Sequence, residues 1–230
     1  MVKEKMTEVS KVSAAETPVA TGRWAAGEDP AKRTQILEGA KRVFMKMGFD
    51  AASMNDVTRE AGVSKGTLYV YFANKEELFT AMIETERAAF VAALRVVLEH
   101  HDDVEEGLHD FGLSFISHVT SEKVISAMRT VLGVRDRMPV LCQRFFNGPE
   151  NLRTVLHAYL TRYVTSGELE IDDVDLAAGQ FLDLASGSFF KFRLFGSMPE
   201  PPSEAEKKRV IDGAIRVFMA AYDARHKEHA

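Results

Sequence analysis

Cysteine and tryptophan are both rare in this chain of 230 residues, which has Cys142 as its only cysteine and Trp24 as its only tryptophan. One cysteine excludes an internal disulfide framework and any cysteine-based zinc or iron–sulfur site. The chain also has no apolar run of the roughly 18–20 residues that a membrane-spanning helix needs. Residues 1–30 contain no apolar core segment, so we expect no secretory signal. These absences predict a cytoplasmic protein with no membrane partner.

Signatures of catalysis are missing as well. The chain has no glycine-rich phosphate loop, no nucleophile elbow and no His-Glu-x-x-His helix. Histidines and acids do gather at residues 100–103 and at His109. A metal site needs a fixed ligand set with supporting groups, whereas imidazoles at one helix end and acids at the next helix start are accounted for by the helix dipoles. We therefore predict no enzyme activity, no cofactor and no metal site.

Charge is distributed unevenly along the chain, whose formal net charge is −5. Residues 30–75 carry 8 basic and 4 acidic side chains, whereas residues 76–230 carry 17 basic and 25 acidic ones. This uneven distribution needs a physical explanation. Binding of a polyanion by the basic residues 30–75, with the acidic residues 76–230 kept away from it, would supply one.

Apolar residues recur at spacings of three and four, which is typical of amphipathic helices. No convincing strand pattern is present. Polar caps, prolines and glycines mark the ends of the predicted helices. These cover residues 30–47, 53–61, 64–72, 74–100, 104–120, 123–137, 139–146, 149–166, 174–195 and 203–226. The sequence predicts an all-α fold of about nine helices, with residues 1–29 as a disordered tail in which Trp24 is either exposed or packed onto the folded part.

The run from Ser53 to Lys75 predicts a helix-turn-helix. Two short helices joined through Ala61-Gly62-Val63 suit that motif, because glycine permits a tight turn. The second helix would place short polar groups at its N-terminus, where they can meet base edges and phosphates. An ordinary solvated helix face is the alternative reading of the same residues. The candidate DNA-contacting residues are Ser53, Asn55, Ser64, Lys65, Gly66, Thr67, Tyr69, Tyr71 and Lys75.

These residues resemble the TetR family of bacterial transcriptional regulators. The matching pieces are Ile36-Leu37, Ala40, Phe44, Gly48-Phe49, Asp56-Val57, Ala61 to Tyr69, Tyr71-Phe72 and Asn74 to Leu78. The resemblance implies an all-helical homodimer, with a DNA-binding domain at residues 30–75 and a ligand-binding and dimerisation domain at residues 76–230. It also implies that Lys65, Gly66, Thr67 and Tyr69 face bases or adjacent backbone. Ser53, Asn55, Ser64, Tyr71 and Lys75 would mainly meet phosphates.

The C-terminal part resembles the AefR-like subgroup of that family, through residues 162–169 and 173–181. Aromatic and flexible apolar residues of the middle helices are either plain core or the lining of a pocket for an apolar effector. The candidate lining residues are Phe111, Phe115, His118, Met128, Arg129, Leu132, Phe145, Phe146, Leu156, Gln180 and Phe181.

Small and apolar residues near the C-terminus suggest a symmetric helical dimer interface, with internal packing as the alternative. The candidates are Leu184, Gly187, Ser188, Phe192, Ile211, Ile215, Phe218 and Tyr222. The sequence thus favours a ligand-responsive repressor that a small-molecule effector releases from a near-palindromic operator. An activator, or a helical small-molecule binding or scaffold protein with an inactive DNA reader, stays open.

Overall fold

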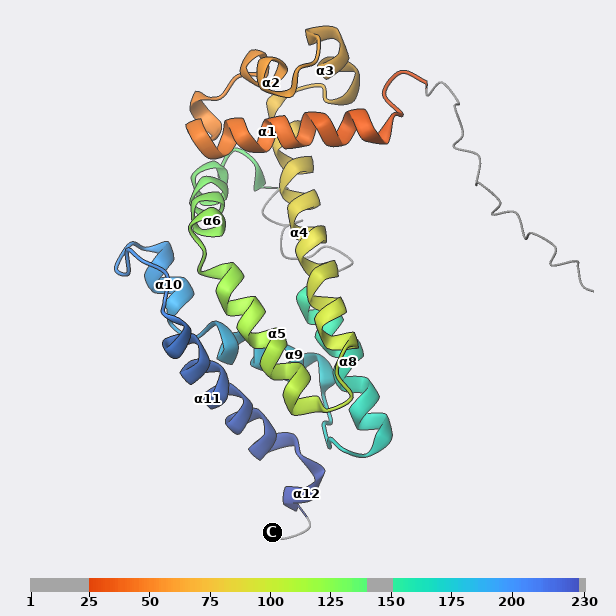
Figure 1. Ribbon diagram of the computed structural model, residues 1–230, viewed down its shortest axis with the longest axis vertical. Helices are drawn as coiled ribbons and strands as arrows, with labels where there is room; N and C mark the ends of the chain where they lie inside the picture. Colours follow the sequence, from red (N-terminus) through yellow and green to blue (C-terminus); the bar gives the residue numbers. More distant parts are fainter. Residues whose placement is uncertain (1–24, 140–150, 228–230) are drawn as a thin grey trace, which may run out of the picture.

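The computed structural model describes residues 25–139 and 151–227, which are almost entirely helical (Figure 1). Nine of the helices in this part of the chain have seven residues or more, so the all-α prediction is confirmed. None of the described helices is long and apolar enough to cross a membrane. The helices are α1 (Pro30–Ala51), α2 (Met54–Ala61), α3 (Lys65–Tyr71), α4 (Lys75–Glu99), α5 (Val104–Val119), α6 (Glu122–Val134), α8 (Leu152–Ser166), α9 (Val174–Ser186), α10 (Phe189–Leu194), α11 (Glu204–Tyr222) and α12 (Ala224–Lys227).

Two predicted helix starts are confirmed in atomic detail. Ser53 begins α2 with a capping box, in which its hydroxyl accepts from the Asp56 amide and the Asp56 carboxylate accepts from the Ser53 amide. Asn74 caps α4 by accepting from the Glu77 amide. Such caps satisfy amides that a helix start otherwise leaves without partners. Gly62 ends α2 at φ 64°, ψ 37°, a left-handed conformation that favours glycine, and this turns the chain toward α3.

Helices α1–α3 and the first turns of α4 share one apolar core, and we call them the N-terminal unit. Its buried residues include Ile36, Phe44, Leu68 and Phe79. The same core includes Val131 and Val134 of α6, together with α4 residues beyond position 75. Figure 1 shows α4 running from this unit into the rest of the fold, with α6 lying beneath α1.

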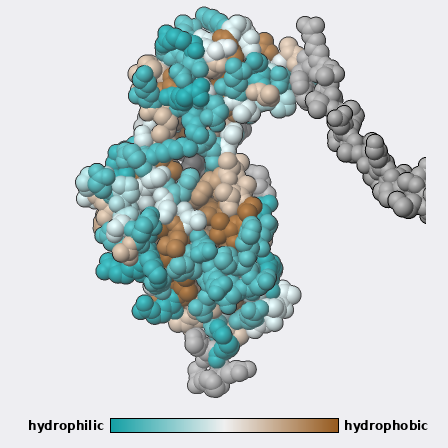
Figure 2. All heavy atoms as spheres, viewed as in Figure 1, coloured by the Kyte–Doolittle hydropathy of each residue, from teal (hydrophilic) through white to brown (hydrophobic). Residues whose placement is uncertain are grey.

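The other helices form the C-terminal bundle, which packs around a chain of aromatic rings. Phe181 of α9 lies between Phe111 of α5, at 6.2 Å between ring centroids, and Phe218 of α11, at 5.4 Å. All three are essentially inaccessible to solvent. Figure 2 shows a mostly hydrophilic surface over the N-terminal unit and hydrophobic side chains gathered on one face of the bundle.

Several predicted helices have different bounds in the structure, and the two largest differences lie near the C-terminus. The single helix expected over 174–195 is wrong, because Gly187 adopts φ 52°, ψ −150° and separates α9 from α10. The last helix ends at Tyr222 instead of continuing to residue 226, since Asp223 forms an antiparallel bridge with Leu169. Most of the helix predicted over 139–146 lies outside the described residues.

Candidate nucleic-acid interface

Helix α3 presents one buried face and one open face. Leu68 is fully buried against α1 and α2, which fixes the orientation of the helix. Ser64 caps its start by accepting from the Thr67 amide at 3.0 Å, and the two hydroxyls lie 2.8 Å apart. Lys65 and Tyr69 are exposed on the other face, with the Lys65 ammonium 5.8 Å from the Tyr69 ring centroid. The helix start therefore offers hydroxyls, an ammonium and a phenol to solvent.

Gly66 leaves the first turn of α3 without a side chain. A Cβ atom there would meet only the Ser64 hydroxyl, at 3.8 Å, so nothing within the chain forbids a larger residue. The open space beside this backbone suits close approach of an external group. Ser53 and Asn55 are exposed at the start of α2, although the Ser53 hydroxyl also binds the Asp56 carboxylate at 2.5 Å. The structure thus brings most of the candidate DNA-contacting residues to an exposed position on α2 or α3.

Two of the candidates are directed inward instead. The Tyr71 hydroxyl lies 3.2 Å from the amide nitrogen of Asp29 and 3.3 Å from its carbonyl oxygen, at the start of α1. The Lys75 ammonium donates to the carbonyl oxygens of Phe49 and Ala52 at 2.8 and 3.0 Å, at the end of α1. Both groups bind the ends of α1 in this structure, and the expectation that they meet phosphates stays a prediction. The sequence concealed this because their partners are more than twenty residues away.

The candidate effector residues divide into core and surface. Phe111, Leu156 and Phe181 are fully buried and Phe115 nearly so, all within one packed cluster. At the surface, the Leu132 side chain is 46% exposed. Met128 is half-buried on α6, and Phe145 and Phe146 lie outside the described residues. None of the candidates within the described residues lines either of the two clefts described below.

The polar candidates for orienting an effector are engaged within the chain. The His118 ring stacks on Phe90 with centroids 3.4 Å apart, and burial, with the nearby Lys123 charge, lowers its pKa. Arg129 donates to the carbonyl oxygens of Arg193 and Leu194. Gln180 accepts from the Tyr222 hydroxyl at 2.6 Å.

The candidate interface residues also divide by burial. Ile211 and Phe218 are fully buried and Ile215 is nearly so, which places all three in the bundle core. Ile211 and Phe218 cannot present an outer surface, so the interpretation of these two as interface residues is corrected to internal packing, whereas Ile215 also lines the cleft between α5 and α11 described below. Phe192 is 46% exposed and Ser188 is also exposed, whereas Leu184, Gly187 and Tyr222 are half-buried. On the outer sides of the same helices, Leu176 and Val217 are 49% and 56% exposed, and the sequence reading omitted both.

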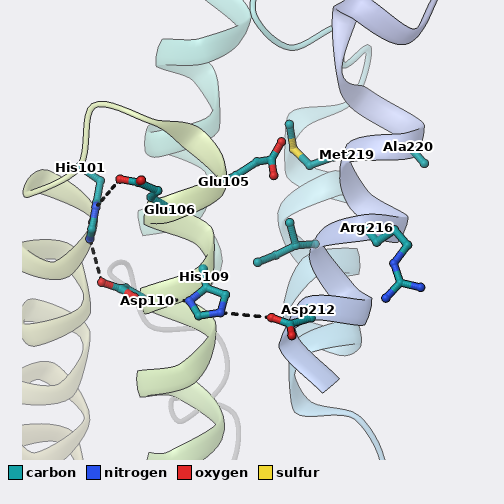
Figure 3. A pocket seen from close by; sticks show the side chains of 10 residues that line it. His101, Glu105, Glu106, His109, Asp110, Asp212, Arg216, Met219 and Ala220 are labelled. Carbon is teal, nitrogen blue, oxygen red and sulfur yellow. Dashed lines mark hydrogen bonds and ion pairs between the residues drawn. The ribbon is translucent and has the colours of Figure 1, made fainter. Parts of the chain in front are cut away.

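A cleft of about 780 Å³ lies between α5 and α11, with His101 at one end (Figure 3). Asp110 bridges two imidazoles, at 3.0 Å from His101 Nε2 and 3.5 Å from His109 Nδ1. His109 Nε2 lies 3.3 Å from Asp212 of α11. No three ligand side chains converge for a metal ion anywhere in the described ranges. These groups therefore satisfy one another and join the two helices.

A second cleft, of about 610 Å³, lies between the N-terminal unit and the end of α6. Arg33, Tyr71, Glu77 and Arg137 are among its lining residues. Its position at the junction of the two parts of the fold could not be found from spacing in the sequence.

Comparison with known proteins shows two matched regions. Residues 36–82 match the family described as bacterial regulatory proteins, tetR family. Residues 106–224 match the AefR-like transcriptional repressor C-terminal domain. The HTH-type transcriptional regulator YfiR of Bacillus subtilis (strain 168) is 34% identical over 108 residues, which are 43% of this chain and 52% of YfiR. The matched part thus spans about half the length of that relative.

Two solved structures share the fold. A TetR-family transcriptional regulator from Mesorhizobium loti MAFF303099 has a TM-score of 0.77 and 24% identity, covering 84% of this chain and 97% of its own. The flavonoid-responsive regulator FrrA has a TM-score of 0.66 and 27% identity, covering 85% of this chain and 98% of its own. Both similarities extend over the N-terminal unit and the bundle together.

Proposed function

Because the chain belongs to the TetR family of DNA-binding transcriptional regulators, with an AefR-like C-terminal domain, we propose that it is a ligand-responsive repressor. In this proposal a homodimer holds a near-palindromic operator, and a small-molecule effector releases it. The family is not enzymatic, so its activity rests on binding alone. The domains predicted at residues 30–75 and 76–230 take the DNA-binding and effector-binding roles.

The observation that carries the proposal is the open face of α3. Lys65, Gly66, Thr67 and Tyr69 surround the start of a helix whose opposite side is locked by Leu68. Such a helix enters the major groove with its N-terminal residues toward the base edges. Hydroxyls and lysines there can also bind phosphate oxygens, which gives salt-dependent affinity. Ser53, Asn55 and Ser64 complete the proposed contact surface.

Dimerisation is proposed because two half-sites need two recognition helices, separated by roughly 34–36 Å. The exposed apolar side chains of Leu176 on α9 and Val217 on α11 support a contact surface along these helices. Leu184, Gly187, Ser188, Phe192 and Tyr222 are proposed to belong to the same contact surface. A closed symmetric pair would bury these residues against their own copies.

The effector is proposed to be an apolar small molecule. FrrA is described as flavonoid-responsive and shares 27% identity with this chain, which supports a small-molecule signal. Met128, Phe145 and Phe146 keep their proposed place in its pocket. An effector that binds a splayed state better than the DNA-bound state would empty the operator by population shift.

The test is selection of duplexes from a random pool by the purified protein, followed by a gel shift of the selected site at several salt concentrations. We expect a two-fold symmetric footprint and an affinity that falls steeply with salt. Tyr69→Ala is the informative variant, with the exposed Phe195→Ala as its matched control. A folded dimer that selects nothing at low salt would favour the scaffold reading, with an inactive DNA reader.

A further inference from the structure

One carboxylate joins three helices where the N-terminal unit meets the bundle. Glu86 belongs to α4, and its Oε1 accepts a hydrogen bond from Lys41 Nζ of α1 at 2.6 Å. Its Oε2 accepts one from Lys123 Nζ of α6, also at 2.6 Å. Each oxygen of a single side chain therefore holds a different helix against α4.

Helix α6 is a second connection between the two parts of the fold, in addition to α4. Its first residue, Glu122, accepts from Arg193 of α10 at 2.7 Å. Its other end contributes Val131 and Val134 to the core of the N-terminal unit. Just beyond that end, Arg137 lies 2.8 Å from the Asp50 carboxylate at the end of α1. A movement of the bundle helices can thus be transmitted to α1 through the contacts at the two ends of α6.

Glu86 supplies the negative charge that the Lys41 and Lys123 ammonium groups share at this junction. Burial raises the pKa of the Glu86 carboxyl, but the Lys123 and Lys41 ammonium groups outweigh it and hold the pKa below its usual range. The Glu86 and Lys41 side chains are 33% and 24% exposed, so solvent screens them only in part. Without the carboxylate, the Lys41 and Lys123 ammonium groups would lose their shared partner and repel each other, while Lys41 would keep Glu38 at 4.0 Å.

We propose that Glu86 is a positioning residue for DNA binding, and this rests on the proposed function. By clamping α1 and α6 onto α4, it fixes the orientation of the N-terminal unit on the bundle. In a dimer that orientation sets the separation of the two α3 helices. An operator fixes the same separation through its half-site spacing. We call the two Glu86 ion pairs the Glu86 clamp. Its loss weakens operator binding at the preferred half-site spacing and makes the protein less selective for that spacing.

The first test needs no DNA. Nitroxide labels are placed at exposed positions through Arg59→Cys in α2 and Ala158→Cys in α8, with Cys142→Ser as the background. Labelled protein is diluted with unlabelled protein, so that only distances within one chain are measured. We expect one narrow distribution of label-to-label distances in the protein that keeps Glu86, and a broadened or shifted distribution in the Glu86→Gln variant. An unchanged distribution would overturn the proposal.

The second test uses duplexes selected by the wild-type protein and variants of them with the spacer changed by one base pair in either direction. For Glu86→Gln we expect about a fivefold loss on the selected spacing, a smaller loss on the altered spacings and an unchanged salt slope. An equal loss on every duplex would indicate a general structural defect and overturn the positioning role. A wild-type protein that selects no duplex contradicts the proposed function itself, whereas the distance distribution still tests Glu86.

Two further variants keep the outcome interpretable. Glu60→Gln is the matched control, because Glu60 forms a comparable ion pair with Arg42, at 2.5 Å, within the N-terminal unit alone. It should leave the distance distribution and the spacing preference unchanged. The quadruple variant Glu38→Gln, Lys41→Glu, Glu86→Lys and Lys123→Glu restores both ion pairs with inverted charges, and Glu38→Gln removes the carboxylate that lies 4.0 Å from Lys41 and would repel a glutamate there. It should recover the wild-type distribution, and failure to do so would count against the clamp.

Discussion

The ammonium nitrogen of Lys75 lies 2.8 Å from the carbonyl oxygen of Phe49 and 4.5 Å from the centroid of the same residue's ring. The start of α4 is thereby fastened to the end of α1, where carbonyl groups otherwise have no helical partner. Arg137 of the segment after α6 approaches the same ring at 6.0 Å. Phe49 is thus a meeting point for α1, α4 and α6.

Lys75→Met should therefore act on stability more than on direct DNA contact. Hydrogen bonds from a charged group to carbonyl oxygens contribute about 1–2 kcal/mol after allowance for partial exposure. We expect a loss of that size in the free energy of unfolding, measured by urea denaturation. The salt slope of operator binding should stay as in the wild type.

Lys65→Met is the matched comparison, since Lys65 is exposed on α3. It should change stability by less than about 0.5 kcal/mol and lower the salt slope by about one unit, as loss of a phosphate contact does. If Lys75→Met lowers the slope while leaving stability intact, Lys75 contacts phosphate after all.

Tyr69→Ala should weaken operator binding without unfolding the protein. Tyr69 is 45% exposed and its ring lies 5.8 Å from the Lys65 ammonium, so truncation of this largely open side chain should cost little stability. We expect a loss of about 1–3 kcal/mol in operator binding, measured by fluorescence anisotropy. Tyr71→Phe should affect stability and not operator binding. It removes the hydroxyl that binds Asp29, so we expect the free energy of unfolding to fall by about 1 kcal/mol. Equal effects of the two variants on DNA affinity would contradict this assignment.

Local signals in the sequence predicted much of the fold. Ser53 and Asn74 cap helices in the structure because capping depends on residues only three positions away. The break at Gly187 escaped prediction because the apolar pattern continues unchanged on both sides of it. The directions of Tyr71 and Lys75 depend on α1, which is remote in sequence.

The same limit applies to the predicted pocket and interface. Both α9 and α11 are apolar on more than one side, so spacing alone cannot say which side faces the chain's own core. The structure assigns Ile211 and Phe218 to that core and leaves Leu176 and Val217 outside. The Glu86 clamp was equally hidden, since its lysines come from helices separated by 37 and 45 residues.

Phe181→Ala distinguishes core packing from a pocket lining. Phe181 is fully buried between Phe111 and Phe218, so its removal should cost about 3–5 kcal/mol of unfolding free energy. Thermal and urea denaturation measure this loss, and Phe195→Ala, at a side chain that is 81% exposed, is the control. A loss below about 1 kcal/mol would show that the site is loosely packed and would restore the pocket interpretation.

The lowered pKa of the buried His118 side chain predicts that the stability of the folded protein falls in mild acid. Burial, followed by the nearby Lys123 charge, lowers the pKa of this imidazole in the folded protein, with Glu86 opposing. The unfolded chain therefore takes up the proton first as pH falls, so stability is highest above the unfolded pKa of about 6.5 and declines as pH drops toward the folded value. His118→Leu should flatten this decline between pH 7.5 and pH 5.5, as measured by urea denaturation at each pH. His157→Gln, at an exposed position on α8, should keep the wild-type decline, and an unchanged slope in His118→Leu would assign the acid sensitivity to other groups.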